Sequence, residues 1–183
     1  MGVGTLKRAV FLDRDGVLNH AVVRNGKPYP PQTAEELRVV EDAPAALTRL
    51  RTAGFLLLVA TNQPDVGRGT QTLDELQAIN GKLQASLPLD GIFMCLHGTD
   101  GCECRKPKPG LLLQGAERHG VDLSGSYMIG DRWRDMDAAH AAGVAGVWID
   151  CGYAEREPSA PPAARVKNLR EAVDWILDQE SRR

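Results

Sequence analysis

The sequence predicts an α/β fold, a Rossmann-like parallel sheet with helices on both faces. Short apolar runs alternate five times with amphipathic helical patterns, which is the order that gives a parallel sheet covered by helices. The chain has 183 residues, of which 43% are hydrophobic, so it is long enough for one domain with a substantial core. We therefore expect a single domain over residues 1–183, without an insert long enough to form a sizeable cap domain.

The expected strands are five short apolar runs, at residues 9–12, 55–60, 91–96, 127–129 and 144–149. The expected helices cover residues 44–53, 72–87, 109–120, 136–142 and 169–177. Glycines stand at three of the helix ends, and two helices begin at a Thr or Asn with Glu three residues later, the spacing of an N-terminal cap. Residues 154–166 are rich in proline and polar side chains, which favours a surface connection.

Composition argues against two kinds of partner. A formal net charge of −2 does not suit a general binder of nucleic acid or of anionic membranes, since both need a basic surface. No apolar run approaches the ~20 residues of a membrane span, and the first residues lack the pattern of a signal peptide. We therefore expect the protein in the cytoplasm, where cysteines stay reduced. We also expect a monomer, because the sequence shows no obvious exposed apolar patch.

Chemically active side chains follow four of the expected strands. DRDG, residues 13–16, follows the first strand, and TNQ, residues 61–63, follows the second. Arg105 and Lys106 come after the third, and GDRWRD, residues 130–135, follows the fourth. Because ligands bind beyond the carboxyl ends of parallel strands, we expect these segments to meet. Carboxylates for Mg²⁺, cations for phosphate oxygens and hydroxyl donors are the groups that phosphoryl transfer requires.

Three of the four cysteines lie near one histidine in the spacing C-x-H-x₄-C-x-C. Such a set of soft ligands suits a closed, tetrahedral, structural Zn²⁺ site; the expected ligands are Cys95, His97, Cys102 and Cys104. No C-x-x-C pair is present, so a thioredoxin-like redox site is not favoured. The zinc loop, residues 95–104, directly precedes Arg105 and Lys106, so metal binding there would order both cations.

Four segments, FLDRDGVLN, VATNQ, RKPKPG and IGDRWRD, resemble the motifs of the haloacid dehalogenase-type (HAD) phosphohydrolases in their usual order. The resemblance covers roughly residues 10–137. It implies that Asp13 attacks phosphorus to form an aspartyl-phosphate, and that Asp15 acts first as an acid and then as a base. It also implies that Thr61 and Lys106 stabilise the transferring phosphoryl group. Alone, Asp13 and Asp15 would equally suit a turn before a helix.

The same resemblance implies a catalytic Mg²⁺ held by Asp13, the backbone carbonyl of Asp15, and Asp131. Asp135 then has two interpretations. It either orients Lys106 or a metal-bound water, or it caps the helix that follows. Gly16 would allow the sharp turn after the two carboxylates.

The stretch CxH…CxCRKPKPG narrows the resemblance to a zinc-loop branch, the heptose-bisphosphate 7-phosphatases and the histidinol-phosphate phosphatases. Arg68, in TNQPDVGRGT, favours the heptose enzymes, because an additional arginine suits a sugar with a second phosphate, and Arg105 would help in the same way. Asn62 and Gln63 are expected to bind substrate, although both would also suit an ordinary strand end.

The predicted function is therefore a Mg²⁺-dependent phosphomonoesterase that uses an aspartyl-phosphate. Its expected substrate is a small phosphorylated sugar, D-glycero-D-manno-heptose 1,7-bisphosphate, from which it would remove the 7-phosphate. The alternatives are a histidinol-phosphate phosphatase, a nucleic-acid end phosphatase and a non-catalytic scaffold stabilised by zinc.

Overall fold

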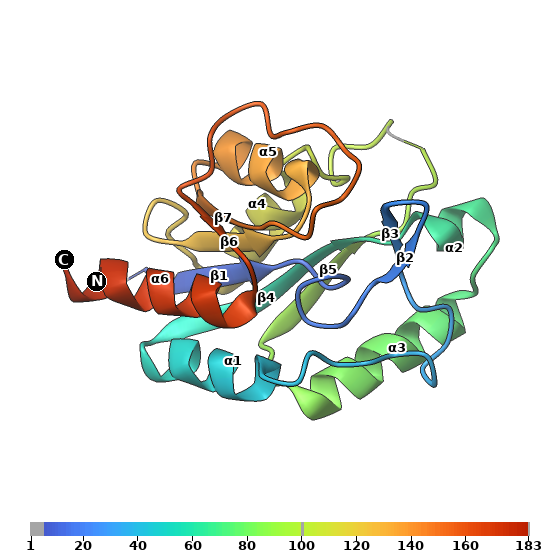
Figure 1. The fold of residues 1–183 in the computed structure, drawn as a ribbon, viewed down its shortest axis with the longest axis horizontal. Helices are drawn as coiled ribbons and strands as arrows, with labels where there is room; N and C mark the ends of the chain where they lie inside the picture. The colour runs from blue at the N-terminus through green and yellow to red at the C-terminus, as the bar shows by residue number, and fades with distance from the viewer. Residues whose placement is uncertain (1–5, 100, 183) are drawn as a thin grey trace.

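The computed structural model describes residues 6–99 and 101–182. Six strands form one parallel sheet, in the order β5-β4-β1-β6-β7-β8 (Figure 1). They are β1 (Arg8–Leu12), β4 (Phe55–Asn62), β5 (Gly91–Cys95), β6 (Tyr127–Gly130), β7 (Ala145–Ile149) and β8 (Ala164–Val166). Because successive strands spread in opposite directions from β1, the carboxyl ends of β1 and its two neighbours form the crevice where this kind of sheet binds ligands.

Helices cover both faces of the sheet. They are α1 (Ala43–Thr52), α2 (Pro64–Arg68), α3 (Leu73–Ser86), α4 (Gly110–His119), α5 (Trp133–Ala142) and α6 (Leu169–Ser181). Figure 1 shows α4 and α5 on one side of the sheet and α1, α3 and α6 on the other. Strand β1 serves both cores, because Val10 and Leu12 pack toward α1 and α6 whereas Ala9 and Phe11 pack toward α4.

The predicted fold class is confirmed. All five expected strands and all five expected helices are present, and their ends lie within a few residues of the expected ones. One expectation was wrong, because the segment 154–166 is not only a surface connection. Its last three residues form β8, which pairs with β7 at the sheet edge. A three-residue edge strand after a proline-rich stretch gives too short a pattern to identify from sequence.

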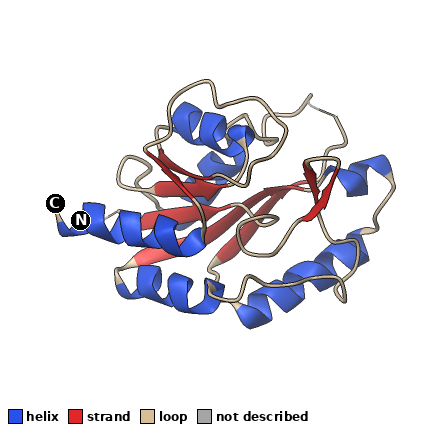
Figure 2. Cartoon of the chain, in the orientation of Figure 1, coloured by secondary structure: helices blue, strands red, loops and turns tan. Residues whose placement is uncertain are grey.

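A small hairpin was also missed. Strands β2 (Val22–Arg24) and β3 (Lys27–Tyr29) pair antiparallel and lie apart from the main sheet, close to α2 (Figure 2). Asn25 and Gly26 turn the chain between them with φ angles of 50° and 71°. An Asn-Gly pair is the strongest short-range hairpin signal, so the sequence did contain the information.

No described helix combines the length and apolar character needed to pass through a bilayer.

Candidate active site

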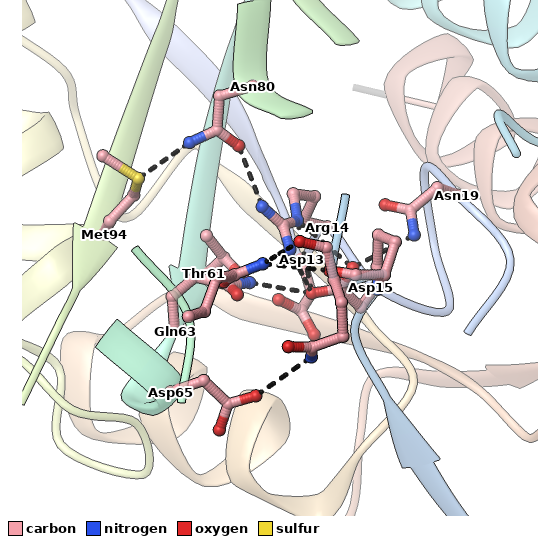
Figure 3. Close-up of polar contacts among 12 residues, drawn as sticks. Asp13, Arg14, Asp15, Asn19, Thr61, Gln63, Asp65, Asn80 and Met94 are labelled. Carbon is pink, nitrogen blue, oxygen red and sulfur yellow. Dashed lines mark hydrogen bonds and ion pairs between the residues drawn. The ribbon is translucent and has the colours of Figure 1, made fainter. Parts of the chain in front are cut away.

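The residues predicted to meet do surround one cavity at the carboxyl ends of β1, β4 and β5. Its volume is about 380 Å³. Each of the four segments contributes to its lining, although Asp131 and Gln63 do not. The predicted residues that line it are Asp13, Asp15, Thr61, Asn62, Arg68, Arg105, Lys106 and Asp135. Figure 3 shows Asp13, Asp15 and Thr61 gathered at the ends of their strands.

A buried ammonium stands between two carboxylates beside this cavity. The side chain of Lys106 is 2% exposed, and its Nζ lies 2.9 Å from Oδ1 of Asp13 and 2.5 Å from Oδ1 of Asp135. Burial opposes the charge of Lys106, but Asp13 and Asp135 outweigh it and raise the pKa of the amine. Lys106 therefore remains cationic. Asp135 contacts Lys106, as the first of its two interpretations requires.

Asp135 also fulfils the other interpretation. Its Oδ2 accepts a hydrogen bond of 3.0 Å from the backbone N–H of Arg132 at the start of α5. One carboxylate thus caps the helix and orients the lysine.

Asn62 fixes the main chain of Lys106. Its Nδ2 donates to the Lys106 carbonyl at 2.9 Å, and its Oδ1 accepts from the Lys106 N–H at 3.0 Å. This paired contact ties the end of β4 to the residue that follows the cysteine-rich loop.

Three carboxylates crowd together without enough positive charge to balance them. Ligand oxygens of Asp13, Asp131 and Asp135 all lie within 4.8 Å of one another. Burial raises the pKa of Asp13 to about 6, despite the opposing effect of Lys106. Burial, Asp13 and Asp135 raise the pKa of Asp131, and the nearby Tyr153 hydroxyl only partly offsets them. Neither buried oxygen of Asp131 meets hydrogen-bond geometry with any described group. These hard oxygen ligands fit Mg²⁺.

Gly16 is required where it stands. Its φ is +95°, and a Cβ added there would lie 1.9 Å from Oδ2 of Asp131. Gly54 has nearly the same φ, +89°, but a Cβ added to it would meet no atom within 4 Å.

We expect Gly16→Ala to lower stability and Mg²⁺ affinity, because the new methyl group must displace Asp131. Gly54→Ala is the matched control, since it carries the backbone strain without the collision. Strain alone should cost about 1 kcal/mol in both variants. Thermal unfolding and Mg²⁺ titration would check this, and equal Mg²⁺ affinity in the two variants would contradict it.

Gln63 occupies a different position from the one expected. It is fully buried, does not line the cavity, and donates through Nε2 to Oδ2 of Asp15 at 2.8 Å and to the Thr61 hydroxyl at 2.9 Å. Figure 3 shows it between these two side chains. It therefore supports two residues at the cavity instead of lying where a substrate could touch it.

The cysteine cluster has the geometry of a metal site. The Sγ atoms of Cys95 and Cys104 lie 3.4 and 3.3 Å from Nδ1 of His97, and each lies 3.5 Å from Sγ of Cys102. A tetrahedron with Zn–S bonds of about 2.3 Å has edges of roughly 3.7 Å, so the four atoms fit one Zn²⁺. Residue 100 of the expected zinc loop lies outside the described residues.

Both arginines expected near the substrate are tied to this loop. Nε of Arg68 donates to the Gly98 carbonyl at 3.2 Å, and Nη1 of Arg105 donates to the His97 carbonyl at 3.0 Å. The loop that carries the cysteine cluster therefore contacts both of these cations at the cavity.

Several lining residues were not anticipated. Lys27 and Tyr29 reach the cavity from the hairpin, and Arg132 and Arg134 reach it from the start of α5. The Asn-Gly turn would have indicated the hairpin, but no sequence pattern places its tip beside a cavity formed by distant strands.

Comparison with known proteins places this geometry in a family. The Hydrolase_like family model, described as HAD-hydrolase-like, matches residues 103–172. The D-glycero-β-D-manno-heptose-1,7-bisphosphate 7-phosphatase of Helicobacter pylori (strain J99) is 37% identical over 181 residues, covering 94% of this chain and 98% of the relative. The chain belongs to this HAD phosphatase family. The family member of Escherichia coli (strain K12) is 35% identical, over 93% of this chain and 88% of the relative.

A solved structure of the same family agrees. The D,D-heptose 1,7-bisphosphate phosphatase from B. bronchiseptica, complexed with magnesium and phosphate, superposes with a TM-score of 0.76 at 31% identity. The match covers 94% of this chain and 99% of that one. This chain is accordingly a phosphoric monoester hydrolase of the HAD type, as the sequence predicted.

Proposed function

We propose that this chain is a Mg²⁺-dependent phosphatase that removes the 7-phosphate of D-glycero-D-manno-heptose 1,7-bisphosphate. The observation that carries the proposal is the buried group of Asp13, Lys106 and Asp135 beside a cavity of about 380 Å³. The Asp13 carboxylate lies next to a fixed cation, which supports Asp13 as the nucleophile, because phosphoryl transfer to an enzyme needs both groups.

The proposed reaction has two steps. In the first, an oxygen of Asp13 bonds to phosphorus while the bond from phosphorus to the sugar oxygen breaks, and Asp15 gives that oxygen its proton. In the second, a water attacks the aspartyl-phosphate, Asp15 takes a proton from it, and inorganic phosphate leaves as Asp13 is restored. Lys106 neutralises phosphoryl charge in both steps, and the Thr61 hydroxyl donates a hydrogen bond to a phosphoryl oxygen.

Asp13, Asp131 and the carbonyl of Asp15 would hold Mg²⁺, with Asp135 beside them. When bound, the ion supplies positive charge for the phosphoryl oxygens. The orphaned oxygens of Asp131 are the feature of this chain that supports the assignment.

Charge distinguishes the two substrate candidates. Of the titratable side chains that line the cavity, six are cationic and four are acidic. Arg68 and Arg105 belong to the cationic set, and a second phosphate would pair with them. Histidinol phosphate instead carries an ammonium group, which this cavity would repel. The names of the relatives support the same choice.

The deciding experiment compares kcat/KM for heptose 1,7-bisphosphate and histidinol phosphate at one Mg²⁺ concentration. We expect the bisphosphate to be favoured by at least about 100-fold, since two charge-assisted contacts each contribute roughly 1.5–3 kcal/mol. A preference for histidinol phosphate would overturn the substrate assignment. Inactivity toward every ester with Mg²⁺ present would favour a scaffold.

The proposal includes the remaining expectations from the sequence. Zn²⁺ bound by Cys95, His97, Cys102 and Cys104 would be structural, because all four positions come from protein. Residues 1–183 would form one domain, acting as a monomer in the cytoplasm, where reduced thiols remain available to the metal. The terminal residues 1–5 and 183 lie outside the described part of that domain.

A further inference from the structure

Arg14 stands between the two carboxylates of the DRDG segment, yet the proposed reaction gives it no role. Its side chain is fully buried, and it is the largest such residue in the described part of the chain. A buried guanidinium is costly unless it is paired, and a buried ion pair is by itself weak evidence of stabilisation. The contacts that pair it therefore indicate what it does.

The guanidinium of Arg14 forms hydrogen bonds with both oxygens of the Asp15 carboxylate. Nε lies 3.2 Å from each carboxylate oxygen, and Nη2 lies 3.0 Å from Oδ2. The third nitrogen, Nη1, donates to Oδ1 of Asn80 at 2.9 Å. Asn80 is a buried residue of α3, so the guanidinium is anchored to a helix while two of its nitrogens hold the carboxylate (Figure 3).

Two amides complete the support of Asp15. Asn19 donates through Nδ2 to Oδ1 at 3.0 Å, and Gln63 donates through Nε2 to Oδ2 at 2.8 Å. Both oxygens are thus held by donors from different segments, while the Asp15 side chain keeps 14% of its surface exposed and lines the cavity. A carboxylate held in this way cannot rotate freely, and its exposed part faces the cavity.

We propose that Arg14 is a positioning residue, which directs the Asp15 carboxylate at the oxygen of the leaving alcohol. The inference rests on the proposed acid/base role of Asp15. A general acid must lie within hydrogen-bond reach of the atom that it protonates, and a displacement of about 1 Å can cost about 100-fold in rate. Arg14 supplies that alignment through its paired contact, which a single point charge cannot reproduce.

The test uses two leaving groups. An alkoxide leaving from a sugar phosphate needs the proton of Asp15, whereas nitrophenolate leaving from p-nitrophenyl phosphate is stable without one. Arg14→Met should therefore lower kcat/KM for the sugar phosphate by at least about 30-fold, a smaller effect than the roughly 100-fold or more expected for complete loss of general acid catalysis, and for the aryl phosphate by no more than about threefold. Equal losses with both esters would overturn the inference.

Two further variants keep the test decisive if Arg14→Met folds poorly in thermal unfolding. Arg14→Lys keeps the charge but loses the paired contact, so it should stay at least about tenfold selective against the sugar phosphate. Full recovery in Arg14→Lys would overturn positioning. Asn80→Ala frees the guanidinium without touching the cavity and should shift the ratio in the same direction. An unchanged ratio in Asn80→Ala would also count against the inference.

Asp15→Asn separates this inference from the function on which it rests. It should show the same selective loss with the sugar phosphate, and a larger one than any Arg14 variant. If Asp15→Asn is selective and Arg14→Met is not, the acid/base role stands and positioning by Arg14 is wrong. If Asp15→Asn lowers both esters equally, both proposals fail.

Discussion

Asp13→Asn should lower kcat by at least about 10⁴-fold with every phosphate ester, because an amide cannot form the acyl-phosphate. An acid-quenched sample of the wild-type enzyme should carry a phosphoryl group on the peptide containing Asp13, and the variant should carry none. The loss should be the same for alkyl and aryl esters, because both need the Asp13 carboxylate to form the aspartyl-phosphate. This pattern distinguishes Asp13 from Asp15 and Arg14.

The fold should survive this substitution. Burial raises the pKa of Asp13 to about 6, so the folded protein disfavours its ionised form. Above pH 6 the charge on Asp13 therefore lowers stability, and the neutral Asn should leave Tm unchanged or higher at pH 7. Lys106 keeps its partner Asp135, 2.5 Å away.

Asp174→Asn is a matched control for the carboxylate-to-amide change. Asp174 is a residue of α6 that forms a surface ion pair with Arg49 at 2.7 Å. It does not line the cavity. It should retain wild-type kcat, because an exposed pair contributes little. Turnover by Asp13→Asn within about tenfold of wild type would refute the nucleophile assignment.

Much of the fold follows from local sequence, because buried parallel strands leave an unmistakable pattern. Strand β4 is a run of eight residues with an uninterrupted apolar centre, and its neighbours on the sheet are similar. Periodicity did not reveal the small elements, although the Asn-Gly turn is a local signal for one of them. The hairpin β2–β3 exposes Val22, Val23 and Tyr29, so it has no buried face from which a period could be read.

The site divides in the same way. Several residues at the cavity can be expected from motifs, because Asp13, Asp15 and Thr61 come at or just after the end of an apolar run. Residues that support them cannot, because Gln63 and Arg14 contact side chains that lie far away in the sequence. Gln63 was expected to bind substrate as part of the TNQ motif, yet it bridges Asp15 and Thr61 and does not line the cavity. Arg14 was overlooked because nothing in DRDG shows that Asn80, 66 positions later, accepts from its guanidinium.

The second large effect concerns the cysteine cluster. Cys102→Ala removes the atom that lies 3.5 Å from the sulfurs of both Cys95 and Cys104. We expect the zinc content to fall from one ion per chain to below about a tenth after dialysis against a weak chelator. Losing a structural metal should cost about 2–4 kcal/mol of stability, or about 4–16 °C in Tm for a chain of this size.

Activity should fall in a particular manner. Arg68 and Arg105 donate to carbonyls of the zinc loop, whereas the main chain of Lys106 is held by Asn62. KM for a bisphosphate should therefore rise by more than kcat falls, because the loop positions binding groups while the nucleophile and its lysine keep other supports. Steady-state kinetics below the new Tm would measure the two effects separately.

Cys151→Ala is the control for loss of a thiol. Cys151 is the one described cysteine outside the cluster of Cys95, His97, Cys102 and Cys104, so this variant should retain its full zinc content. If Cys102→Ala also retained zinc, the four-ligand assignment would be wrong. If it lost zinc with KM and kcat unchanged, the cluster would stabilise its own loop without ordering the arginines at the cavity. A rise in KM together with loss of zinc would instead link a metal outside the reaction to recognition of the substrate.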